Sequence, residues 1–159
     1  MEHFNKAKAM KLRSHLGKYL VADDDKLCQS KQGATKRAVW EIELIIGKSH
    51  CVRLKSSNRW YLTATDATFL LGVTENKVVQ ANFDYGMDWK LEWEPITDGF
   101  HMKLRSWCGK YLRGNSGMAS WRNSVTHNWI LCDLEPVHEF PVKIVSFTES
   151  KFSSLDSED

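Results

Sequence analysis

Basic side chains follow a regular pattern in three separated segments of this 159-residue chain. Within residues 9–13, 52–55 and 102–105, Lys or Arg alternates with apolar residues, so a strand would carry its charges on one face. A basic surface of this kind would bind an acidic protein partner through an attraction that salt screens. The predicted partner-binding residues are Lys11, Arg13, Arg53, Lys55, Lys103 and Arg105 on strands, Arg59 and Lys110 in turns, and Lys31, Lys36 and Arg37 in a loop.

Tryptophans outside the regular pattern of the chain point to a second chemistry. Trp60 and Trp107 lie at or beside predicted turns, and Trp121 is a further surplus aromatic residue. An exposed indole offers a flat apolar surface together with a polar N–H group, which suits stacking on a sugar ring. A carbohydrate-binding, lectin-like protein that stacks glycans on these three residues is therefore the alternative function. The competing interpretation is that Trp60 and Trp107 cover the base of the barrel.

Enzymatic chemistry finds little support in the sequence. The six histidines are dispersed, and none has a carboxylate companion at the spacing of a known motif. Ser14, Ser56 and Ser106 occupy equivalent positions, so we interpret them as strand-end hydroxyls that satisfy the turn backbone. The cysteines occur singly, without the paired spacing of a zinc site, and are expected to be reduced thiols. We predict no catalytic residue, no metal and no cofactor.

A repeated sequence motif defines the elements that must position these side chains. Residues 12–20, 54–62 and 104–112 each carry Leu, a base, Ser and a final Tyr-Leu at the same offsets. Gly17 and Gly109 stand where a hairpin must turn, and Arg59 replaces glycine in the second copy. Each copy is followed by an apolar stretch that opens with tryptophan, and these tryptophans are predicted to begin the fourth strand of each unit. They are Trp40, Trp89 and Trp129.

Three such units predict an all-β fold of twelve strands, the β-trefoil, in which a six-stranded barrel is capped by three hairpins. The pseudo-equivalent four-stranded repeats span about 7–46, 48–97 and 99–136. A further C-terminal strand over about 139–147 would lie beside the N-terminal segment and brace the barrel. Residues 1–147 thus form a single domain, and the Ser- and acid-rich residues 148–159 form a flexible tail.

The phrase Leu-Arg-Ser-x-x-Gly-Lys-Tyr-Leu, with its later tryptophan, resembles the repeat of the fascin-type trefoils, which are actin-bundling proteins. Residues 4–15 look still more like a plant family of fascin-like trefoils, described as a domain of unknown function or as actin cross-linking proteins. The resemblance covers about residues 3–147 and implies a non-enzymatic protein-binding module with filamentous actin as a partner. Fascins carry several trefoils, so one trefoil alone would decorate a filament, and cross-linking would need a dimer or a second face.

Composition limits the other partners. Lys and Arg number 22 against 20 Asp and Glu, and the net charge of +2 gives no overall field that favours nucleic acid. The first residues lack the apolar run of a signal peptide, and no segment is apolar for long enough to cross a bilayer. We therefore expect a cytoplasmic protein that binds neither nucleic acid nor membrane. The sequence leaves its oligomeric state open.

Overall fold

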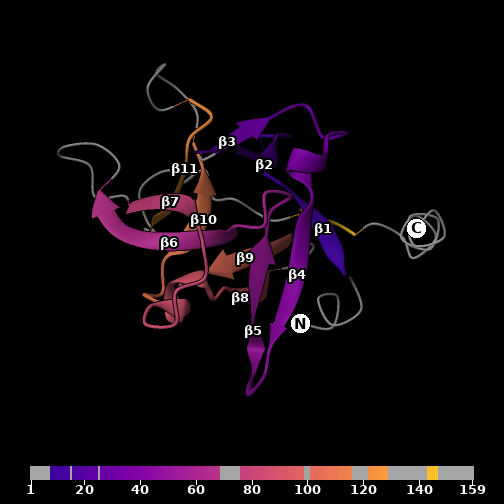
Figure 1. The fold of residues 1–159 in the computed structure, drawn as a ribbon. Coiled ribbons are helices and arrows are strands. Elements are labelled where there is room, and N and C mark those ends of the chain that lie inside the picture. The colour runs from indigo at the N-terminus through magenta and orange to yellow at the C-terminus, as the bar shows by residue number, and fades with distance from the viewer. Residues whose placement is uncertain are drawn as a thin grey trace.

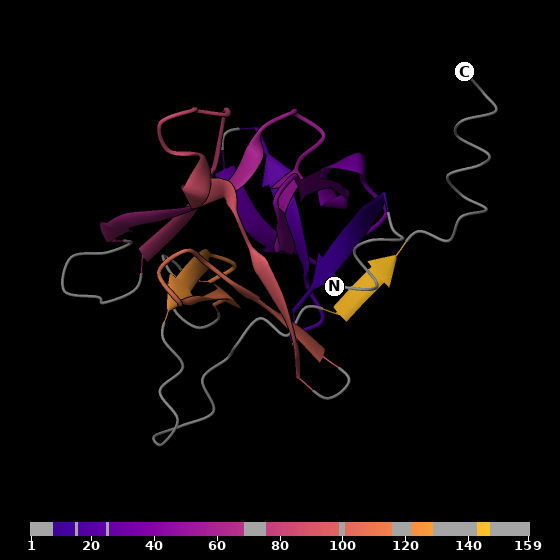
Figure 2. The ribbon, with the colours of Figure 1, turned by 90° about the horizontal axis from the view of Figure 1, so that it is seen from below.

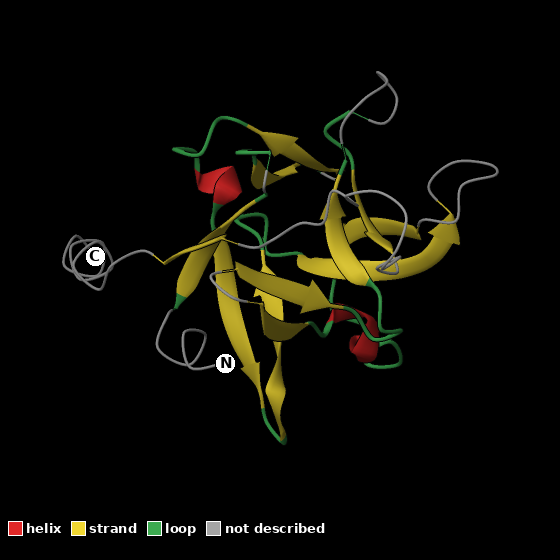
Figure 3. Ribbon diagram, turned by 180° about the vertical axis from the view of Figure 1, so that it is seen from behind, coloured by secondary structure: helices red, strands yellow, loops and turns green. Residues whose placement is uncertain are grey.

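The computed structural model describes residues 8–14, 16–24, 26–68, 76–98, 101–115, 122–128 and 143–146. These residues form twelve strands and two short 3₁₀ turns (Figures 1 and 3). The first unit contains β1 (Ala9–Arg13), β2 (Tyr19–Asp23), β3 (Lys26–Ser30), η1 (Lys36–Ala38) and β4 (Trp40–Ile45). The second contains β5 (Lys48–Lys55), β6 (Tyr61–Thr68), β7 (Asn76–Ala81), η2 (Asp88–Leu91) and β8 (Glu94–Asp98), and the third contains β9 (His101–Arg105), β10 (Tyr111–Gly114), β11 (Val125–Asn128) and β12 (Lys143–Ser146).

The strand pairing closes a ring. Antiparallel ladders join β1 to β4, β4 to β5 and β8 to β9, and β12 pairs with β1 in the register Met10↔Ser146 to Arg13↔Lys143. A bridge between Val52 and Trp93 connects β5 to the start of β8, and β12 also lies against β9. Six strands therefore form the barrel, while β2–β3, β6–β7 and β10–β11 form three hairpins that cap it. The predicted β-trefoil is confirmed.

The strand β12 stands in the barrel between β9 and β1 (yellow in Figure 2). This strand lies in the C-terminal segment that was expected to brace the barrel. It is the fourth strand of unit three, a place that the prediction had given to the residues beginning at Trp129. Residues 129–134 and the predicted tail, 148–159, lie outside the described residues. No helix among the described residues is long and apolar enough to cross a membrane.

The three repeated turns have the same geometry. In the first, the Ser14 N–H donates to the Lys18 carbonyl at 2.8 Å and the Gly17 N–H donates to the Ser14 carbonyl at 2.9 Å. The turns after Ser56 and Ser106 repeat both bonds. Gly17 and Gly109 have φ of 73° and 82°, and Arg59 takes the same left-handed conformation at 69°. The backbone of each serine thus closes the turn without its hydroxyl, so the predicted role of these hydroxyls is wrong.

The core contains the apolar members of the alternating strands, among them Leu12, Leu54 and Leu104. Two fully buried tryptophans complete it. The Trp40 indole N–H donates to the Leu20 carbonyl at 3.1 Å, and the Trp93 indole N–H donates to the Leu62 carbonyl at 3.0 Å. Trp93 is therefore the counterpart of Trp40, and the prediction that Trp89 opens the fourth strand of unit two is wrong. Trp89 lies in η2, which is the counterpart of η1 in unit one.

A ring of buried polar side chains joins the three hairpins of the cap. Gln29, Gln80 and His127 stand opposite Leu20, Leu62 and Leu112 in their ladders. Gln29 donates to the Asn115 and Ser124 carbonyls of unit three, Gln80 to the Asp24 and Lys26 carbonyls of unit one, and His127 bonds to the Thr65 carbonyl of unit two. Because buried polar groups are costly without partners, each hairpin fixes its neighbour.

Candidate functional site

A groove of about 510 Å³ opens where unit two meets unit three. Its walls come from the beginning of β5, from η2 and β8, and from the turn between β9 and β10. The residues that line it are Lys48, His50, Cys51, Trp89, Glu92, Glu94, Arg105, Ser106, Trp107 and Gly109. Its volume falls within the range of about 300–1,000 Å³ that is usual for small-molecule sites.

Two tryptophans form the aromatic part of the groove. Trp89 and Trp107 meet edge to face, with ring centroids 4.5 Å apart and planes at 80°. They remain 38% and 40% exposed, although large apolar side chains are normally covered. The Trp107 indole N–H donates to the Ala64 carbonyl at 2.9 Å, and the Lys90 ammonium lies 5.2 Å from the centroid of Trp89. These contacts hold both indoles in place while leaving part of their surface open to a ligand.

Two ion pairs form the polar part of the groove. Lys48 Nζ lies 2.8 Å from Glu92 Oε2, and this hydrogen bond raises the pKa of the lysine. Arg105 Nη2 lies 2.8 Å from Glu94 Oε2 across the β8–β9 ladder. Burial, followed by the two glutamates, raises the pKa of the Cys51 thiol and favours its neutral form. The groove thus offers carboxylate acceptors and cationic donors in balanced pairs.

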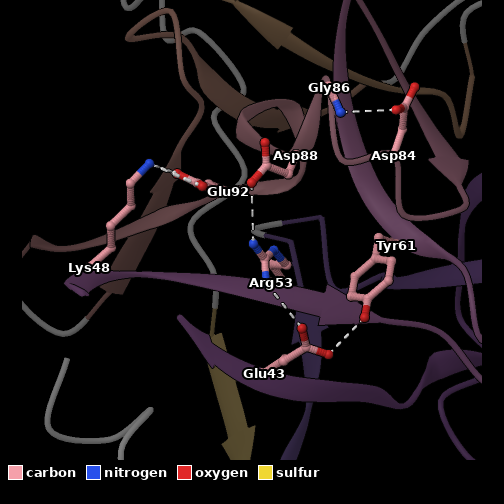
Figure 4. A network of polar contacts seen from close by, with 8 residues as sticks. All are labelled: Glu43, Lys48, Arg53, Tyr61, Asp84, Gly86, Asp88 and Glu92. Atoms are coloured by element: carbon pink, nitrogen blue, oxygen red, sulfur yellow. Dashed lines mark hydrogen bonds and ion pairs between the residues drawn. The ribbon is translucent and has the colours of Figure 1, made fainter. Parts of the chain in front are cut away.

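A neighbouring polar network fixes η2 on the barrel (Figure 4). Arg53 lies between Glu43, at 3.2 Å, and Asp88 at the start of η2, at 3.8 Å, with its guanidinium 4.9 Å from the Phe83 ring centroid. The Tyr61 hydroxyl donates to Glu43 at 2.7 Å. Burial opposes ionisation of Glu43, but the hydrogen bonds from Tyr61 and Arg53, together with the charges of Lys55 and Arg53, lower the pKa of this carboxyl. Arg53 is therefore a structural link between β5 and the wall of the groove.

Most of the basic residues predicted to bind a partner contact groups of the protein itself. Ion pairs engage Arg37 with Asp23, Arg53 and Lys55 with Glu43, Arg59 with Glu41, and Arg105 with Glu94. Lys103 lies over the Tyr111 ring, Lys110 donates to Asn76, and Lys11 and Arg13 are half-buried on β1. Lys31 and Lys36 are exposed, and neither forms an ion pair with another described residue. The strand positions stand on β1, β5 and β9, which are separated from one another in the barrel by β4, β8 and β12.

Of the three tryptophans predicted to stack on a sugar, only Trp107 lies in the groove. Trp60 is half-buried at the equivalent turn of unit two, and Trp121 lies outside the described residues. Trp89 was not among the predicted stacking residues, because it was predicted to begin the fourth strand of unit two. The dipeptide Trp-Glu, at 40–41 and again at 93–94, was the available signal. Aligning it would have placed Trp93 in the core and left Trp89 as a surplus aromatic residue.

Comparisons with known proteins agree with the fold. Residues 1–134 match the family model described as a beta-trefoil domain of unknown function, DUF569. A search of curated protein sequences found no match.

Solved structures share the fold at low sequence identity. A Caenorhabditis elegans protein of unknown function has a TM-score of 0.69 at 16% identity, with 88% of this chain and 94% of that chain covered. The designed threefold-symmetric protein ThreeFoil has a TM-score of 0.67 at 17% identity, covering 88% and 99%. A Polyporus squamosus lectin, solved with the epitope Neu5Acα2-6Galβ1-4GlcNAc, has a TM-score of 0.69 at 11% identity, covering 88% and 49%.

Proposed function

Because the chain belongs to the DUF569 family of β-trefoil domains, whose function is unknown, we propose a function from its groove: a non-enzymatic module that binds an uncharged carbohydrate. The observation that carries the proposal is the combination of two partly exposed indoles with two ion pairs in one groove. Lectins occur among the proteins of similar fold, but at 11% identity that likeness supports the fold alone.

The chemistry of a sugar ring matches both parts of this groove. The C–H face of a pyranose is apolar and can pack on an indole, while its hydroxyls both donate and accept hydrogen bonds. Glu92 and Glu94 supply acceptors, and Lys48 and Arg105 supply donors. Since each carboxylate is already paired with a cation, the groove has no excess charge with which to attract an ionised ligand. An uncharged saccharide is the ligand class that these groups favour.

The test is a screen of uncharged glycans followed by calorimetric titration of the tightest binder. We expect Trp107→Ala to weaken the affinity by more than about tenfold, because it removes one stacking surface. Trp60→Ala, at the equivalent turn but away from the groove, is the matched control and should bind like the wild type. If the folded wild type binds no uncharged glycan, or if both variants lose affinity equally, the groove does not have this function.

The second candidate is binding to an acidic protein surface such as filamentous actin. It is favoured by the loop after β3, where Lys31 and Lys36 are exposed and without an ion pair to the described residues, close in sequence to Arg37. Co-sedimentation with actin filaments at low and near-physiological salt tests it, beside a variant in which all three residues are changed to Glu. Saturable, salt-sensitive pelleting that this variant loses and Lys77→Glu keeps would favour this function over carbohydrate binding.

A further inference from the structure

We infer that His127, buried against the turn that carries Trp107, is a positioning residue for Trp107, and that its protonation weakens glycan binding. The inference rests on the proposed function, because it assigns a regulation to the same groove. Its structural part, the coupling between His127 and the Trp107 indole, can be measured without any ligand.

Both rings are held by neighbouring groups. On β6, the Ala64 carbonyl accepts the Trp107 indole N–H at 2.9 Å, and the next carbonyl, that of Thr65, bonds to His127 Nε2. On its other side, His127 Nδ1 lies 3.2 Å from Ser106 Oγ and 3.7 Å from Cys108 Sγ. Ser106 and Cys108 are the residues that flank Trp107 in the chain. The His127 imidazole thus lies between β6, whose Ala64 carbonyl binds the indole, and the β9–β10 turn, which contains Trp107.

These partners determine which protonation state fits. A carbonyl oxygen only accepts, so Nε2 must carry the proton of the neutral ring, which leaves Nδ1 to accept from the Ser106 hydroxyl or the Cys108 thiol. A second proton would bind to Nδ1. The new N–H group would then point at the Ser106 hydroxyl and the Cys108 thiol, which donate to Nδ1 of the neutral ring. The Ser106 hydroxyl would have to rotate and accept from Nδ1, and the buried ring would carry a positive charge against the turn. Because Ser106 and Trp107 both line the groove, this change in the contacts of the turn is expected to alter the binding surface.

The surroundings favour the neutral ring. His127 is fully buried, and burial lowers its pKa; Lys110 lowers it further, against the hydrogen bond to the Thr65 carbonyl. Lys77 on β7 and Arg113 on β10 add positive charge on the strands that pair with β11. Asp66, next to Thr65, is the opposing charge on β6, and it is exposed and 3.7 Å from Lys90. The imidazole therefore stays neutral at pH 7 and gains its proton only below its ordinary pKa of 6.5.

The other two units show that this position does not require a titrating side chain. Gln29 and Gln80 occupy it in units one and two, and both donate to hairpin carbonyls as His127 does in unit three. The unit with histidine is also the unit whose turn carries Trp107. His127→Gln is accordingly a conservative variant that the fold already accommodates twice, and it removes the titration.

The experiment measures glycan affinity from about pH 7.5 to about pH 5 for the wild type, His127→Gln and His50→Gln. We expect the wild-type affinity to fall by roughly fivefold or more as the pH drops, and the His127→Gln affinity to remain level. His50→Gln should retain the fall; this control is needed because His50 lines the groove and could itself titrate. A level wild-type profile, or a fall that persists in His127→Gln, overturns the inference.

A second readout needs no glycan. The NMR resonance of the Trp107 indole N–H reports its bond to Ala64, and we expect it to shift with pH in the wild type and to stay constant in His127→Gln. If no glycan binds but this shift is seen, the proposed function fails while the positioning role stands. If the resonance does not respond to pH in the wild type, the positioning role fails, whatever the groove binds.

Discussion

Two tryptophans only four residues apart, Trp89 and Trp93, have opposite roles. Trp93 is fully buried and donates to the Leu62 carbonyl, whereas Trp89 stands on η2 with its ring against Trp107 and partly open to solvent. The difference comes from backbone geometry, since η2 ends at Leu91 and the chain is extended from Glu92 onward. One residue type thus fills the core at one position and forms a binding surface at the other.

This contrast predicts unequal effects on stability. Trp93→Ala should lower the free energy of unfolding by about 3–5 kcal/mol, because it leaves a large cavity in the barrel. Trp89→Ala should lower it by about 1 kcal/mol or less, since it removes one exposed ring contact. Urea unfolding measures both. Should Trp93→Ala fail to fold, Trp93→Phe, which mainly removes the bond to Leu62, should still be less stable than Trp89→Phe. Equal losses would contradict the assignment.

At the scale of elements, the repeated turn holds its conformation with different residues. Gly17 and Arg59 have nearly the same positive φ, although a side chain in this region costs about 1–2 kcal/mol. Arg59 bears that strain in the native protein, and its exposed ion pair with Glu41 offsets little of it. The closing hydrogen bonds of the turn, and the ladders that begin on either side of it, keep the conformation in place.

Alanine at these two positions should therefore have different effects. Gly17→Ala should reduce the free energy of unfolding by about 1 kcal/mol through φ alone, because no atom lies within 4 Å of the added Cβ. Arg59→Ala should change it by about 0.5 kcal/mol or less, because a Cβ is already present there. Denaturant titration of the two variants decides the matter, and a loss at residue 59 as large as that at residue 17 would argue against strain as the cause.

The sequence predicted the elements better than the site. The spacing of Leu, Ser and Tyr-Leu located the turns, and the alternation of Lys and Arg with apolar residues located the first strand of each unit. The ion pairs were not predictable, because the carboxylates that engage Arg53 and Arg105 stand on neighbouring strands whose register only the pairing defines. The groove escaped prediction for a similar reason, since Trp89 and Trp107 meet only after η2 and the β9–β10 turn are folded side by side.

For the whole molecule, the groove breaks the threefold pattern. At the junction of units one and two, Lys36 and Ser57 occupy the positions of Trp89 and Trp107. That junction keeps paired charges, Glu41 with Arg59, but neither of those two positions is aromatic. The barrel strands are repeated at the junction of units one and two, but the pair of tryptophans proposed to bind a sugar is not.

Among the residues that the structure describes, only the junction of units two and three is proposed as a sugar site. We therefore expect one glycan per chain, in place of the three that a symmetric trefoil would allow. Titration calorimetry with the glycan identified by screening measures this stoichiometry directly. Replacing Trp89 and Trp107 together by Ala should abolish all binding, whereas Lys36→Ala should leave both stoichiometry and affinity unchanged. Residual binding to two sites in the double variant would show that the ligand uses positions related by the pseudo-threefold axis.

The ring of cap hydrogen bonds runs against the direction of the chain. The polypeptide passes from unit one to two to three, while the side chains reach from unit one to three, from three to two, and from two to one. The hairpins of units two and three are thus each connected to the preceding unit in two ways. The first is the peptide chain, and the second is a buried side chain that bonds to a carbonyl of that unit. The chain does not run from unit three to unit one, so no peptide connects them in that order. The Gln29 side chain spans this junction. Gln29, together with Lys18, whose ammonium donates to Asn123 of unit three, thereby supplies without a peptide bond the continuity that closes the cap.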